Sequence, residues 1–112
     1  MYRVNDERDV HLYEILCLFN PNIPEDDLKE RAMYYRAVLC DNGSACTIQN
    51  RGKRSLCYPI QGCVTATYIQ ILYLATEDLL KLFDQELKRD DTLLRYIRTK
   101  LYELPPILEP LK

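Results

Sequence analysis

Four of the five cysteines of this chain, and all three of its glycines, lie in one segment, residues 40–63. The cysteines form two pairs with the same spacing, Cys40 with Cys46 and Cys57 with Cys63. The midpoint between the pairs falls in Asn50-Arg51-Gly52-Lys53-Arg54, where Asn and Gly favour a turn. We therefore expect a β-hairpin near residues 45–60 that turns at this midpoint and places Cys46 opposite Cys57.

Three interpretations of these cysteines remain open. If the flanking turn residues fold the chain back, four thiolates could bind one zinc ion, although zinc sites usually have shorter spacings. Disulfides 40/63 and 46/57 are a second interpretation, but the charged N-terminal segment is not a signal peptide, which indicates a reducing compartment. We favour the third, free cysteines that serve as small core side chains. Zinc is thus the one cofactor left open, with four candidate ligands: Cys40, Cys46, Cys57 and Cys63.

Apolar residues at helical spacing predict helices on both sides of the hairpin. From Asn5 or Asp6 to about Phe19, the apolar positions are i, i+3, i+4 and i+7: Leu12, Ile15, Leu16 and Phe19. A second helix should begin at Pro24, carry acidic residues in its first turn and end near Gly43. Its apolar stripe would be Leu28, Ala32, Tyr35 and Leu39. A last helix should run from Asp90 or Asp91 to about Leu104, where two prolines follow.

Residues 64–74 are consistent with two structures. Their β-branched and aromatic side chains are typical of a strand. Their apolar residues also keep helical spacing into the next segment, and no glycine or proline lies between Gly62 and Pro105. Thr76 could cap a separate helix, but we adopt one long helix over about 65–89. The predicted fold is therefore mainly α, with about four helices and a central hairpin in one domain (1–104), followed by an extended Pro-rich tail (105–112).

Enzymatic activity is not indicated. Nucleophilic catalysis needs a base beside the nucleophile, and the single histidine, His11, lies far from the cysteine segment in sequence. The three glycines match no phosphate-binding motif. Paired acidic residues stand where predicted helices begin, and the helix dipole explains them there. We therefore expect a non-catalytic protein.

The basic residues at the predicted hairpin tip are the best candidates for a nucleic-acid site. Arg51, Lys53 and Arg54 cluster there, and residues 40–75 contain only one acidic residue, Asp41. Two helices followed by a hairpin with a basic tip would have a winged-helix-like arrangement in contact with phosphates. The net charge of -2 argues against strong general attraction to nucleic acid.

Two functions follow as hypotheses. The first is a small regulatory or accessory binding protein, for example from a virus, that contacts another protein or a second copy of itself through its nine tyrosines and its apolar tail. The alternative is a DNA- or RNA-binding regulator that uses the hairpin tip. The longest apolar run, near residues 69–75, is too short to span a membrane, so we expect an intracellular protein, cytoplasmic or nuclear.

Overall fold

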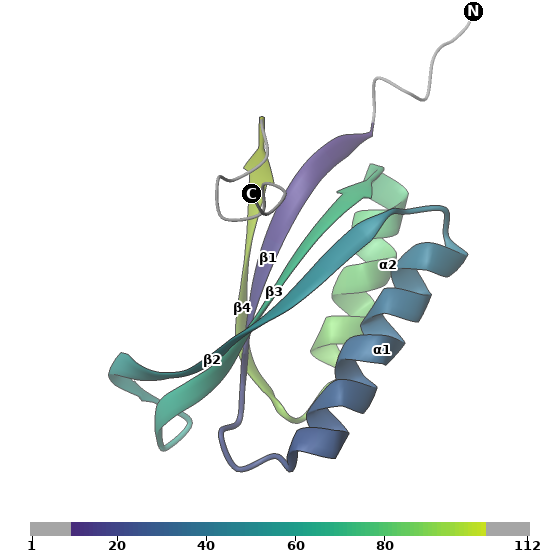
Figure 1. Ribbon diagram of the computed structural model, residues 1–112. Helices are drawn as coiled ribbons and strands as arrows, with labels where there is room; N and C mark the ends of the chain where they lie inside the picture. Colours follow the sequence, from purple (N-terminus) through teal and green to yellow (C-terminus); the bar gives the residue numbers. More distant parts are fainter. Residues whose placement is uncertain (1–9, 103–112) are drawn as a thin grey trace, which may run out of the picture.

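The computed structural model describes residues 10–102, in which two helices pack against one face of a four-stranded antiparallel sheet (Figure 1). The elements follow one another as β1 (His11–Phe19), α1 (Glu25–Asp41), β2 (Cys46–Ile60), β3 (Cys63–Ala75), α2 (Glu77–Lys88) and β4 (Leu93–Leu101). The order of strands across the sheet is β2-β3-β1-β4. The prediction of a mainly helical fold was therefore wrong, because strands make up about half of the described residues.

The segment expected to form the first helix is the central strand β1. Ile15, Cys17 and Phe19 are buried against the helices, while Leu18 is buried on the opposite face of the sheet. A strand buried on both faces is apolar at consecutive positions and loses the alternation that identifies a half-exposed strand. Helical spacing of apolar residues then arises without a helix, which explains the error.

Two other predicted helices were also wrong: one is a strand followed by a helix, and the other is a strand. The expected long helix over 65–89 divides into β3 and α2, and Thr76 separates them. The side chain of Thr76 caps α2 by accepting a hydrogen bond of 3.3 Å from the backbone nitrogen of Leu79. The expected last helix is β4, which pairs with β1 from Leu93 to Leu101.

The helix predicted after Pro24 is confirmed as α1. Pro24 is the N-cap, so the helix begins at Glu25, one residue later than expected, and three acidic residues lie in its first turn. Gly43, with a φ of 86°, lies just beyond the end of the helix, in a left-handed conformation that suits glycine. Leu28, Tyr35 and Leu39 form the buried face of α1, as the spacing indicated.

A β-hairpin exists, but it turns elsewhere than predicted. Strand β2 continues through residues 50–54, with an irregularity near Gly52, and pairs with β3 instead of folding back on itself. The turn lies at Gln61 and Gly62, whose φ angles of 50° and 80° are typical of a tight type I′ turn. Cys46 therefore lies opposite Tyr73, not opposite Cys57.

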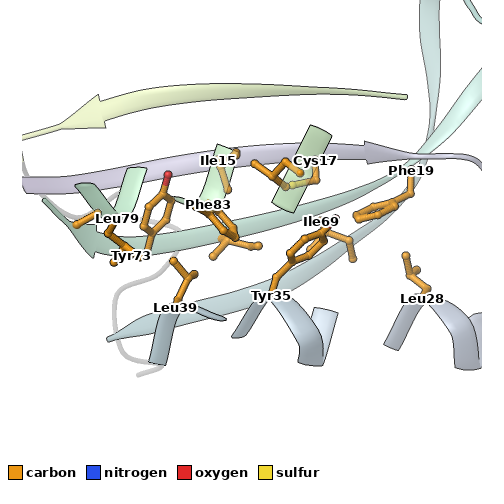
Figure 2. Close-up of a cluster of buried hydrophobic side chains, with 13 residues drawn as sticks. Ile15, Cys17, Phe19, Leu28, Tyr35, Leu39, Ile69, Tyr73, Leu79 and Phe83 are labelled. Atoms are coloured by element: carbon orange, nitrogen blue, oxygen red, sulfur yellow. The ribbon is translucent and has the colours of Figure 1, made fainter. Parts of the chain in front are cut away.

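Aromatic side chains fill the core between the sheet and the helices (Figure 2). The ring of Phe83 in α2 is fully buried and lies 5.7 Å from the ring of Tyr35 and 5.2 Å from that of Tyr73, between centroids. A second, smaller cluster on the opposite face of the sheet is built around Leu18, Ala66 and Leu94. The sheet thus buries apolar side chains on both of its faces.

Part of the prediction concerns residues that the structure does not describe. The start of the expected first helix and the Pro-rich tail, residues 105–112, lie outside residues 10–102. Within the described range, neither helix has the length and apolar character needed to cross a membrane.

Candidate nucleic-acid interface

Charge is divided unequally between the two layers of the molecule. The two helices contain nine acidic and five basic side chains, whereas the four strands contain six basic side chains and one acidic one. Three of the basic residues lie on β2 and three on β4, the two edge strands of the sheet. The sheet layer is therefore the electropositive part of a slightly acidic chain, and phosphate groups would approach it preferentially.

We define the open face as the side of the sheet opposite the helices. In antiparallel pairs, directly opposed residues project from the same face, so the register assigns each side chain to a side. Arg54 lies opposite Ala66, a member of the apolar cluster on the open face. Arg95 lies opposite Leu18 of the same cluster. Both arginines therefore project from the open face, one from each edge strand.

Two tyrosines accompany these arginines. The guanidinium carbon of Arg54 lies 5.9 Å from the ring centroid of Tyr68. The Nη1 atom of Arg95 donates to the hydroxyl oxygen of Tyr58 at 3.4 Å, and Tyr58 is 61% exposed. A guanidinium beside an exposed aromatic ring offers both phosphate binding and a surface on which a base can stack.

Arg51 belongs to the same surface. Its Nη1 atom donates to the Oε1 atom of Gln49 at 2.9 Å. Gln49 lies opposite Gln70 on β3, at an open-face position. We call Arg51, Arg54 and Arg95 the arginine trio.

Lys53, the third basic residue of the predicted tip, lies on the other side of the sheet. It is opposite Thr67, and with Glu25 and Leu28 it lines a small pocket beside α1. The structure therefore separates the predicted basic cluster, since two of its members contribute to the open face and one faces the helices. Their direction follows from the strand alternation, which the assumed turn at residues 50–54 concealed.

Sequence reasoning did not identify Tyr58, and it placed Arg95 in a second basic group on a last helix, diluted by nearby acidic residues, instead of in the site. Arg95, Ile97 and Thr99 alternate in β4 and share the open face, but the segment was interpreted as a helix. The period-two pattern of β4 was the available signal. Arg98, the next arginine in β4, projects from the helix side and forms an ion pair with Asp84 of α2.

One charged group is buried away from this surface. The side chain of Asp90 is 2% exposed and accepts a hydrogen bond of 2.5 Å from the hydroxyl of Tyr35. The backbone nitrogen of Thr92 donates to it at 2.9 Å, and Arg31 lies 3.4 Å away. Burial alone would raise the pKa of Asp90, but the hydrogen bonds from Thr92 and Tyr35 and the charge of Arg31 hold the pKa below its ordinary value. This network joins α1 to the start of β4.

The structure does not gather the four cysteines proposed as zinc ligands. Cys46 faces Tyr73 and Cys63 faces Ile60, while Cys40 and Cys57 are exposed. Among residues 10–102, no three histidine, cysteine or acidic side chains are arranged to hold a metal ion. Cys17 is a buried core thiol, and burial together with the charge of Asp90 raises its pKa to about 12.

The topology defines the class of protein. Two β-α-β units arranged to give the strand order β2-β3-β1-β4, with both helices on one face, form a split β-α-β or ferredoxin-like α/β fold. The family model described as "Ribosomal protein S6" matches residues 12–100. This chain therefore belongs to the ribosomal protein S6 family.

Individual relatives agree with this assignment. The chain is 33% identical over 98 residues to the small ribosomal subunit protein bS6 of Picosynechococcus sp., which covers 87% of this chain and 85% of the relative. It is 32% identical to bS6 of Dictyoglomus turgidum over 93 residues, covering 80% of this chain and 93% of that protein. The crystal structure of 30S ribosomal protein S6 from Thermotoga maritima has the same fold, with a TM-score of 0.77, 15% identity, and coverage of 83% and 89%.

Family membership overturns both functional hypotheses in their original form. The chain is neither a regulatory or viral accessory protein nor a winged-helix DNA-binding regulator. The β2–β3 hairpin is part of the main sheet instead of a wing attached to a helical domain. A family of ribosomal proteins is consistent with the expectation of a non-catalytic role.

Proposed function

We propose that this chain is a structural component of the small ribosomal subunit and that its open face binds ribosomal RNA through the arginine trio. The observation that carries the proposal is the match to the ribosomal protein S6 family over residues 12–100. The excess of basic residues on the edge strands supplies the physical basis, since phosphate contacts dominate protein–RNA affinity. Such a role is intracellular, in the cytoplasm or an organelle.

The two sides of the sheet differ in what they can offer to RNA. On the open face, Arg54 and Arg95 present planar guanidinium groups, which match phosphate oxygens with two hydrogen bonds at once. Tyr58 is exposed beside Arg95, so an unpaired base could stack there. Lys53, on the helix side, lines the same pocket as the acidic Glu25, and it should contribute less to RNA binding.

The experiment compares RNA binding by matched variants. Binding of the purified full chain to small-subunit ribosomal RNA would be measured by filter binding over a series of salt concentrations. Replacing Arg54 and Arg95 by Ala should weaken binding and reduce the slope of log K against log salt by about 0.7–0.9 for each phosphate that the variant no longer neutralises. Lys53→Ala removes one positive charge from the other side of the sheet and should change the slope less than either arginine variant.

Two outcomes would contradict the proposal. If the wild-type chain binds ribosomal RNA without salt dependence, or not at all, the phosphate contacts do not exist. If Lys53→Ala weakens binding as much as Arg54→Ala, the open face is not the binding surface. Circular dichroism of each variant would establish that the sheet and helices remain folded.

Protein neighbours in the subunit form a second part of the proposal. Ile97 is 52% exposed on the open face and lies between the positions of Arg95 and Thr99 in β4. An apolar side chain within a basic surface suits a contact with another ribosomal protein that shares the same RNA. Self-association through the tail stays a prediction, and the mass of the chain in solution would test it.

A further inference from the structure

Aliphatic side chains gather on the open face toward the end of the sheet that lies away from the β2–β3 turn. Leu12 of β1 lies opposite both Leu74 of β3 and Leu101 of β4. Further along β1, Leu16 lies opposite Ile97 of β4 and packs against the apolar cluster of the open face. Every second residue of β1 projects from the same side, so all five share this face. We call Leu12, Leu16, Leu74, Ile97 and Leu101 the aliphatic patch.

Part of this patch is accessible to solvent. Leu74 is 41% exposed and Ile97 is 52% exposed, and both helices pack against the other face of the sheet (Figure 1). Between the two rows of the patch lies Glu14, whose carboxylate accepts a hydrogen bond of 2.5 Å from the Nε2 atom of Gln70. This partner satisfies one carboxylate oxygen, so Glu14 does not prevent the patch from being covered. Adjoining exposed apolar side chains on one face mark a surface that binds another segment.

The chain passes directly from the aliphatic patch into an apolar segment. Strand β4 ends at Leu101, a member of the patch, and residues 103–112 follow the described range. These ten residues include four large aliphatic side chains: Leu104, Ile107, Leu108 and Leu111. We call residues 103–112 the tail. The tail therefore has the apolar chemistry that the patch requires of an occupant.

The length of the tail is sufficient for it to return across the patch. Leu101 and Ile97 are four residues apart on β4, a distance of about 13 Å along a strand. If three residues reverse the direction of the chain after Leu101, residues 105–111 can extend over about 20 Å as polyproline II. The tail can thus cover the patch from Leu101 to beyond Ile97.

The prolines of the tail favour the face of the sheet over its edge. Pro105, Pro106 and Pro110 lack a backbone N–H, so the tail cannot form a continuous hydrogen-bonded ladder with the edge strand β4. The same residues restrict the backbone before it docks, which reduces the entropy lost on binding. Side-chain packing on the face needs no ladder and is compatible with all three prolines.

We propose that, in the free chain, residues 104–111 fold back over the open face and bury the aliphatic patch. The tether determines this occupant, because a segment joined to the patch through a short link has an effective concentration of about millimolar, well above that of a second copy in dilute solution. This inference does not depend on RNA binding. The contact proposed above between Ile97 and another ribosomal protein would require the tail to leave the patch.

Backbone amide NMR spectra of the full chain test the contact from the side of the tail. Replacing both Ile107 and Leu108 by Ser removes two aliphatic groups and leaves every described residue in place. We expect the amide signals of Leu74 and Ile97 to shift in this variant. The signal of Val64, which is 64% exposed beside the β2–β3 turn, should stay where it is.

A substitution in the patch tests the same contact from the other side. Ile97→Ser should shift the amide signals of residues 104–111. Val64→Ser is the matched control, because it also removes a β-branched, exposed side chain but lies outside the patch, and it should leave those signals unchanged. Circular dichroism of both variants would establish that the fold is retained.

Two results would overturn the proposal. Signals that change only within the tail when Ile107 and Leu108 are replaced would show that the tail does not contact the patch. Signals of Leu74 and Ile97 that shift on dilution of the wild type, together with a sedimentation mass of two chains, would show that a second copy covers the patch instead. We expect the mass of one chain and spectra independent of concentration. Neither result changes the expected salt dependence of RNA binding, so the two proposals can fail separately.

Discussion

Removing one hydroxyl from Tyr35 tests whether the buried Asp90 network stabilises the fold. In the structure, this hydroxyl donates to the carboxylate of Asp90 at 2.5 Å. The Tyr35→Phe substitution deletes the donor but keeps the ring, which packs against Phe19 and Phe83 with centroids 6.4 and 5.7 Å away. The apolar core should therefore remain in place, and the measured effect should belong to the hydrogen bond.

The size of the effect follows from the burial of the acceptor. The Asp90 side chain is 2% exposed, so water cannot readily replace the missing donor. A hydrogen bond to a charged group contributes about 1.5–3 kcal/mol to stability, and an unsatisfied buried charge is at the upper end of that range. Because Thr92 and Arg31 still contact the carboxylate, we expect Tyr35→Phe to lower the free energy of unfolding by about 2 kcal/mol near neutral pH.

The pH dependence provides a second measurement on the same variant. The folded-state pKa of Asp90 lies below its ordinary value. The contribution of ionised Asp90 to stability is therefore fully present above about pH 4, the ordinary pKa of an aspartate, and is lost as the pH falls through the folded-state pKa. Tyr35→Phe should raise that pKa, so the stability of the variant should fall less steeply in acid than that of the wild type.

Urea denaturation followed by circular dichroism, near neutral pH and in acid, would measure both effects. Tyr34→Phe is the matched control, because the hydroxyl of Tyr34, which is 48% exposed, donates to Glu86 of α2 at the surface. An exposed hydrogen bond should contribute less than about 1 kcal/mol. The reasoning is refuted if Tyr35→Phe and Tyr34→Phe lower the free energy of unfolding by the same amount. It is also refuted if the difference in free energy of unfolding between Tyr35→Phe and the wild type does not shrink in acid.

Two further predictions concern the core and the hairpin turn. Phe83→Ala should lower the free energy of unfolding by about 3–5 kcal/mol, because its fully buried ring contacts Tyr35 and Tyr73 and the cavity cannot collapse completely; a urea midpoint close to that of the wild type would contradict this. Gln61→Asn should raise the free energy of unfolding by about 0.5–1 kcal/mol, since Gln61 has a φ of 50° and asparagine tolerates that conformation better; a lower melting temperature in a thermal scan would contradict it.

The sequence predicted α1 well because that helix carries several independent signals. Pro24, the acidic first turn and Gly43 mark its ends, and Leu28, Tyr35 and Leu39 mark its buried face. These signals act within one helix and do not depend on the rest of the fold. Thr76 was likewise recognised as a cap, although the long-helix interpretation prevailed over it.

The strands were missed because their burial depends on distant partners. β1 is covered by helices on one face and contributes Leu18 to an apolar cluster on the other, so its sequence lacks alternation. Only the pairing of β1 with β3 and β4 distinguishes it from a helix of the same composition. Local patterns contain no information on that pairing, and for short apolar runs they leave helix and strand ambiguous.

The candidate site was only partly predictable, because it too depends on strand pairing between distant residues. Arg51 and Arg54 could be identified from local charge, but their separation from Lys53 depends on the β2–β3 register. Arg95 comes from the opposite edge of the sheet, and nothing near residues 51–54 in sequence indicates it. The equal spacing of the cysteine pairs suggested one cluster, whereas the register places Cys46 and Cys63 beside different partners.

The position of β1 at the centre of the sheet has a consequence for how a nascent chain acquires its structure. Both strands that flank β1 are synthesised long after it, because Ile15 pairs with Ile71 on one side and with Arg98 on the other. During translation, β1 must therefore wait as an unpaired apolar segment until β3 has left the exit tunnel, and its other edge stays unpaired until β4 follows. Such long-range pairing slows folding and leaves edges open to association with other chains. We expect the sheet to form only after release of β4, so chaperones that bind short apolar segments would act on this protein mainly before that point.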